Sequence, residues 1–165
     1  MEFPQDPDRQ VGRGAAGVRA AHRSAGFRHH RRDREGALSE AVARSLDLLA
    51  ERAGDPAPLV YRRLFEAFPE MEAQFVRDTT GAVRGEMLAV AFQCVLDLDG
   101  GYAANLIRSE RVNHEGFGVP PEAFASFFPI VMETTRAVVG EDWTAEMEAG
   151  WRALLARLEG LVRAA

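Results

Sequence analysis

The side chain most able to do chemistry in this sequence is His114, which stands near the end of an expected helix, two residues before Gly116. The other three histidines fall in an arginine-rich stretch without hydrophobic periodicity: His22, His29 and His30. A lone histidine at a helix end can cap carbonyl groups, pack against a neighbour, or bind a metal ion through a neutral ring nitrogen. Its position alone favours a structural role, so the rest of the chain must decide between these possibilities.

Other motifs narrow the chemistry. Cys94 is the single cysteine of the 165 residues, so no disulfide can form within the chain and a reducing compartment is expected. Its apolar spacing favours a core residue over a reactive thiol. The sequence has no phosphate-binding glycine loop, no paired metal motif and no serine in a nucleophile elbow. A structural zinc site, which needs three or four ligands, is not expected.

Charge is distributed unevenly along the chain. All 20 basic residues are arginine; residues 1–36 hold eight of them against five acids, and residues 37–165 hold twelve against twenty. The body therefore carries a net charge of −8, which argues against binding to nucleic acid. Residues 1–36 lack apolar periodicity, and we expect them to form a disordered tail before one domain over residues 37–165.

Apolar content and its distribution indicate where the protein works. Hydrophobic residues make up 47% of the chain, enough for one domain of this length to bury a core. No stretch approaches eighteen consecutive apolar residues, and the start of the chain lacks the apolar segment of a signal peptide. We therefore expect a cytoplasmic protein with no membrane partner.

Apolar residues recur every three or four positions along the whole body, which predicts an all-α fold. We expect six main helices, over about residues 40–53, 57–68, 82–98, 102–113, 121–139 and 144–163. Ser39 should cap the first helix and Thr144 the last, since a hydroxyl oxygen can accept an unpaired amide at a helix start. His114 follows Ile107 by two helical turns on the same face, so it should point to the interior.

Three segments, in this order on an all-α pattern, resemble the globin family over residues 38–164. They are Leu64–Phe75, Asn113–Val119, and Gly140–Thr144 followed by Trp151. The resemblance implies a globin-like fold packed around a haem pocket, with haem b (iron protoporphyrin IX) as cofactor. It points to a bacterial single-domain globin similar to the globin part of flavohaemoglobins. One neutral imidazole facing an apolar pocket suits a five-coordinate haem iron.

The same resemblance implies roles for individual residues. His114 would be the proximal ligand and the metal-binding residue. Phe75, six residues after a helix-breaking proline, would stack on the haem, and Phe117 and Val119 would pack on its proximal face. Tyr61, fourteen residues before Phe75, corresponds to a distal tyrosine whose hydroxyl can donate a hydrogen bond to bound dioxygen.

The distal helix leaves two registers open. One of two pairs faces the ligand and the cofactor, and in each pair the residues are four apart: Val83 with Met87, or Arg84 with Leu88. Neither pair contains a histidine or glutamine, so Tyr61 would be the sole distal donor unless Arg84 turns inward. Tyr61 has an alternative role too, packed between helices with its hydroxyl on a backbone group.

These residues favour a haem-binding protein that reversibly binds dioxygen, nitric oxide or carbon monoxide over an enzyme. The chain departs from the flavohaemoglobin pattern on the proximal side, where Phe124 replaces a tyrosine and no glutamate follows Glu159. A nitric-oxide dioxygenase, the first alternative, would need electrons from a separate reductase, because the sequence contains no reductase domain. The second alternative is a haem-free globin-fold module that acts as a sensor or interaction domain.

Overall fold

The computed structural model describes residues 35–163, so the tail predicted over residues 1–36 lies outside the described residues except for its last two positions. Those two, Glu35 and Gly36, are helical. Contacts divide the chain after Ala37, and the unit from Leu38 onward contains the features described below.

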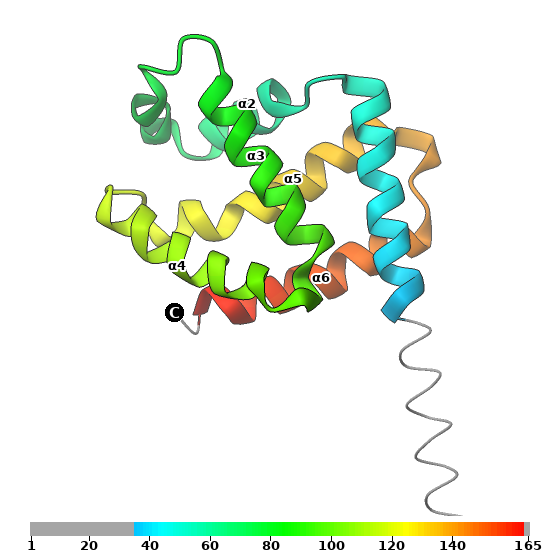
Figure 1. Cartoon of the computed structure of the whole chain (residues 1–165). Helices are drawn as coiled ribbons and strands as arrows, with labels where there is room; N and C mark the ends of the chain where they lie inside the picture. Colours follow the sequence, from blue (N-terminus) through cyan, green and yellow to red (C-terminus); the bar gives the residue numbers. More distant parts are fainter. Residues whose placement is uncertain (1–34, 164–165) are drawn as a thin grey trace, which may run out of the picture. The chain divides into compact units, whose positions relative to one another are not determined.

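The described residues fold into helices joined by short connections and contain no strand (Figure 1). The first helix covers residues 35–53. The longer helices after it are α2 (Ala57–Ala67), α3 (Ala82–Leu96), α4 (Tyr102–Gly116), α5 (Pro121–Val139) and α6 (Ala145–Arg163). Short 3₁₀-helices lie between them: η1 (Pro69–Phe75), η2 (Leu98–Gly100) and η3 (Gly140–Asp142). The predicted all-α fold is confirmed.

The two predicted helix caps had different outcomes. Thr144 does cap α6, because its Oγ1 accepts a hydrogen bond from the backbone N–H of Met147 at 3.2 Å. Ser39 is not a cap, since the first helix already includes residues 35–38. The last of these residues, Leu38, packs with its backbone close to Gly150 of α6, a tertiary contact that sequence periodicity does not reveal.

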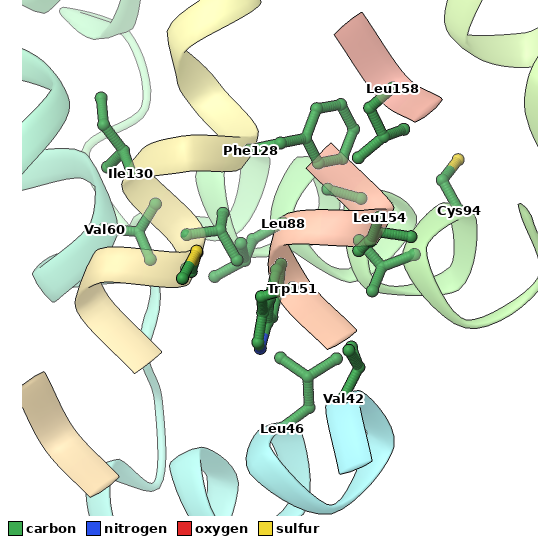
Figure 2. Close-up of a cluster of buried hydrophobic side chains, with 14 of the residues drawn as sticks. Val42, Leu46, Val60, Leu88, Cys94, Phe128, Ile130, Trp151, Leu154 and Leu158 are labelled. Carbon is green, nitrogen blue, oxygen red and sulfur yellow. The ribbon is translucent and has the colours of Figure 1, made fainter. Parts of the chain in front are cut away.

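A buried tryptophan ties the first helix to α6. Trp151 is fully buried, and its Nε1–H donates to Ser45 Oγ at 2.9 Å, while Ser45 in turn donates to the Val42 carbonyl at 2.7 Å. Figure 2 shows the indole among apolar side chains of the core, with Val42 and Leu46 on one side and Leu154 on the other. Trp151 Nε1 and Ser45 Oγ therefore both have hydrogen-bond partners, so this contact leaves no polar atom unpaired in the core.

The first helix and α6 also approach each other closely at a glycine. A Cβ atom built on Gly150 would lie 2.5 Å from the Leu38 carbonyl oxygen and 2.9 Å from Val42 Cγ2. Such distances are inside van der Waals contact, so the crossing requires the absence of a side chain here.

The remaining helices enclose the other end of the core. Helix α2 packs on α3 and α5, while α4 packs on α3, α5 and α6. Figure 1 shows these helices crossing one another rather than running parallel. In the region that the structure covers, no helix is both long and apolar enough to span a membrane.

The close crossing gives a test with an internal control. Replacing Gly150 by Ala should destabilise the protein by about 1–3 kcal/mol, because the added methyl collides with backbone. Replacing Gly160 by Ala, in the same helix with open space around it, should be neutral or stabilise by up to about 1 kcal/mol. Chemical denaturation measures both, and equal stability of the two variants would refute the close crossing.

Candidate functional site

A cavity of about 530 Å³ lies between η1 and the helices α2, α3, α4 and α5. Its deep lining is apolar and buried, with Leu64, Met71, Ala91, Ile107 and Phe128 among the contributing side chains. A volume of this size with few polar groups is typical of a small-molecule or cofactor site. The cavity also brings together most of the residues that the sequence had singled out: Tyr61, Phe75, Val83, Met87, His114 and Val119.

His114 lies in the last turn of α4, which runs through Gly116 rather than ending at Asn113 as predicted. Its Nδ1 is 2.7 Å from the backbone carbonyl oxygen of Glu110, one turn earlier. A carbonyl can only accept, so Nδ1 donates its N–H, and in the neutral imidazole the lone pair is then on Nε2. A metal-binding histidine is commonly oriented in this way, by a hydrogen bond from its other ring nitrogen.

Tyr61 lines the cavity from α2 and is 1% exposed. Its ring packs against Phe65, Phe75 and Phe127, with ring centroids 5.9, 5.1 and 5.8 Å away. Its hydroxyl is buried without a hydrogen-bond partner among the described residues. Burial raises the pKa of this phenol well above its usual value, against a smaller lowering by the charge of Arg84, so the hydroxyl stays protonated and can donate.

An unpaired buried hydroxyl is costly, and it needs a physical explanation. The alternative in which the Tyr61 hydroxyl bonds a backbone group does not occur here, since no partner is within reach. The hydroxyl belongs to a residue of the cavity lining, so a ligand with an acceptor atom could satisfy it.

The start of α3 settles which residues of that helix face the cavity. Val83 and Met87 line it, whereas Leu88 is buried in the core. Arg84 is directed to Asp78, with its Nε 2.9 Å from Asp78 Oδ2, and it lines a separate hollow on the other side of Phe75. The structure therefore has the Val83 and Met87 register, and Arg84 is not turned into the cavity.

Asp78 fixes this register. Its carboxylate accepts the backbone N–H groups of Val83 and Arg84, each at 3.1 Å, in addition to the Arg84 side chain. Desolvation raises the pKa of Asp78, but the hydrogen bonds from Arg84 and Val83 outweigh it and lower that pKa overall. The ionised carboxylate thus holds the first turn of α3, and with it Val83, beside the cavity.

The two residues predicted to pack on the proximal face behave differently. Val119 lines the cavity, and its N–H donates to the His114 carbonyl at 2.9 Å. Phe117 lies outside the lining and is 79% exposed. The prediction that places Phe117 against the cofactor does not match this structure. Its backbone N–H bonds carbonyls of the last turn of α4, and in this turn conformation its ring is left facing solvent.

The surroundings of His114 were only partly predicted. The Phe124 ring lies 5.2 Å from the imidazole, centroid to centroid, while Glu159 pairs with Arg163 on the surface of α6. The carboxylate near His114 comes instead from Glu110, whose Oε2 is 3.5 Å from Nδ1. Sequence reasoning missed Glu110, although its spacing of four residues before His114 on one helix could have indicated it.

Several other lining residues were not predicted either. Cys94 is buried and lines the cavity as well as the core, and burial raises the pKa of its thiol, which keeps it protonated. The outer lining includes exposed or partly exposed polar side chains from η1, α3 and α4: Gln74, Glu86, Gln93, Tyr102 and Glu110.

The donor set fits a cofactor that brings its own metal ligands. Within residues 35–163, no group of three or more His, Cys, Asp or Glu side chains is placed to hold a metal ion. His114 is the one imidazole of the described lining, and the unpaired Tyr61 hydroxyl offers a donor to whatever else binds there. A single imidazole is enough for a haem iron, whose macrocycle supplies four nitrogen ligands.

The role of Asp78 predicts a pH dependence. Because its pKa is lowered in the folded protein, the stabilisation it gives is complete above the unfolded-state pKa and is lost as the pH falls below about 4. The melting temperature of Asp78→Asn should therefore lie below that of the wild type at neutral pH. The difference between the two melting temperatures should become smaller as the pH falls below about 4. Asp47→Asn, at an exposed site of the first helix, is the control. A gap that stays constant with pH would show that Asp78 does not act through its charge.

Comparison with known proteins identifies the family. The globin family model matches residues 59–160, which cover most of α2, most of α6, the elements between them and every cavity-lining residue. The comparisons with curated proteins and with solved structures found no match. The matched segment is more than half of the chain and includes both His114 and Tyr61, so this protein belongs to the globin family.

Proposed function

We propose that this protein binds haem in the cavity and reversibly binds dioxygen or another diatomic gas there, with His114 as the proximal ligand and Tyr61 as the distal donor. One observation carries the proposal: a single cavity is lined both by an imidazole whose Nε2 is available and by a buried hydroxyl without a partner. Membership of the globin family, whose members typically bind haem, supports the same conclusion.

Each residue has a defined part in this proposal. When bound, haem supplies an iron centre with an open coordination position for a gas molecule. His114 would hold the cofactor through Nε2, and the Glu110 carbonyl would orient the ring through Nδ1. Tyr61 would donate a hydrogen bond to a partly negative atom of the gas, and the apolar walls would limit the access of bulk water. Phe75, Val83, Met87 and Val119 pack around the cofactor.

Haem b is the form we propose. Cys94 is the single cysteine, so the paired cysteines that attach haem covalently in a Cys-x-x-Cys-His motif are not present. The cofactor would then be held by ligation and by packing alone. A cytoplasmic location and a separate reductase for any turnover of nitric oxide remain predictions.

Loss of the imidazole should remove the cofactor but not the fold. His114→Ala is expected to retain its helical content and to lose most of its haem, because the iron loses its protein ligand while the core of α5 and α6 is untouched. Absorbance of the purified variant and far-ultraviolet circular dichroism measure the two properties.

Exogenous imidazole provides the control for this variant. It should restore haem binding to His114→Ala by entering the space that the side chain leaves. Full haem occupancy with an unaltered spectrum in the variant, before imidazole is added, would contradict the assignment of His114.

Removal of the Tyr61 hydroxyl should affect dioxygen far more than carbon monoxide. A hydrogen bond to a partly charged acceptor is worth about 1.5–3 kcal/mol, so Tyr61→Phe should release dioxygen roughly tenfold to a hundredfold faster. Carbon monoxide, with little charge on its outer atom, should be released at nearly the wild-type rate. Stopped-flow dissociation rates for both gases test this.

Tyr102→Phe is the matched control, because it makes the same chemical change at another tyrosine of the cavity lining, one that is 72% exposed instead of buried. The free protein should be no less stable in Tyr61→Phe, since the hydroxyl has no partner in the described chain. If the dioxygen off-rate is the same in wild type and Tyr61→Phe, Tyr61 is not the donor.

A further inference from the structure

The mouth of the cavity has an unusual charge for a site that takes an anionic cofactor. Of the described residues that line the cavity, those exposed at its mouth include Gln74, Glu86, Gln93 and Tyr102. Among the described residues that line the cavity, the acidic ones are Glu86 on α3 and Glu110 on α4, and none is an arginine. The opening is therefore neutral to acidic.

The arginines of α3 and α4, the two helices that carry Glu86 and Glu110, have partners outside the cavity lining. Arg84 is held by Asp78, Arg111 lies 3.6 Å from Glu115, and Arg108 donates to Asn105 Oδ1 at 3.2 Å. Haem carries two propionate carboxylates, and an ion of this kind is too costly to bury without a partner. The propionates must then reach solvent at the mouth of the cavity. The carboxylate there, Glu86, carries a negative charge like theirs.

We propose that Glu86 determines how tightly the cofactor is held, because its carboxylate repels the propionates at the mouth. The cofactor is then retained by His114 and the apolar lining, without ion pairs, and exchanges with solution faster than it would beside a neutral or basic residue. Glu110 is the less direct candidate, since its carboxylate lies beside His114 Nδ1. This inference rests on the proposed function.

The test measures the rate at which the haem-loaded protein loses haem to an excess of a tighter-binding acceptor protein. At low ionic strength, Glu86→Gln should lose haem about two- to fivefold more slowly than wild type, the range for an exposed charge interaction. Glu86→Arg, which reverses the charge, should be slower still. Glu133→Gln and Glu133→Arg, at an exposed position of α5 outside the lining, are the matched controls for net charge.

Two further readouts separate charge from packing. Haem dimethyl ester has no propionate charge, so wild type and the Glu86 variants should lose it at equal rates. Added salt should shrink the difference between wild type and Glu86→Gln for haem, because exposed charges are screened over about 8 Å at physiological ionic strength.

The outcomes also separate this inference from the proposed function. Haem loss from Glu86→Arg that is no slower than from Glu133→Arg overturns the role of Glu86 and leaves haem binding intact. An equal effect of Glu86→Gln on haem and on its dimethyl ester overturns it too, because packing and not charge would then be the cause. A wild-type protein that takes up neither compound overturns both proposals.

Discussion

The hydrogen bond between His114 Nδ1 and the Glu110 carbonyl is the constraint on which the site depends. It determines which ring nitrogen carries the proton, and therefore which one can ligate a metal. The bond requires residues 110–114 to be helical, and α4 meets this requirement because it continues to Gly116 before Phe117 and Gly118 turn the chain. A helix that ended at Asn113 would not hold the imidazole in this orientation.

The opposite wall of the cavity depends on a second fixed point, the carboxylate of Asp78. Because Asp78 binds the first amides of α3 and the Arg84 side chain together, Arg84 stays out of the cavity and Val83 enters its lining. The Tyr61 hydroxyl is consequently left without a protein partner. The cavity thus has a buried apolar lining with the imidazole of His114 on α4 and the unpaired phenol of Tyr61 on α2.

Sequence reasoning worked where periodicity or spacing carries the information. The helical period predicted the all-α fold and α5 in full, and the globin resemblance put His114, Phe75 and Tyr61 at one cavity. It failed at two helix ends: the first helix begins before Ser39, and Phe117, just after α4, is exposed to solvent. The register of α3 could not be derived because it depends on a carboxylate five residues before Val83 in the chain.

The central claim is that this cavity binds haem with His114 as the one protein ligand. The most direct measurement is a titration of the purified wild-type protein with haem, followed by absorbance as the sample is reduced and then exposed to carbon monoxide. We predict uptake of one haem per chain, a reduced spectrum typical of five-coordinate iron, and a spectral shift with carbon monoxide. A protein that shows no saturable uptake, or whose reduced haem is six-coordinate and does not respond to carbon monoxide, would contradict the account.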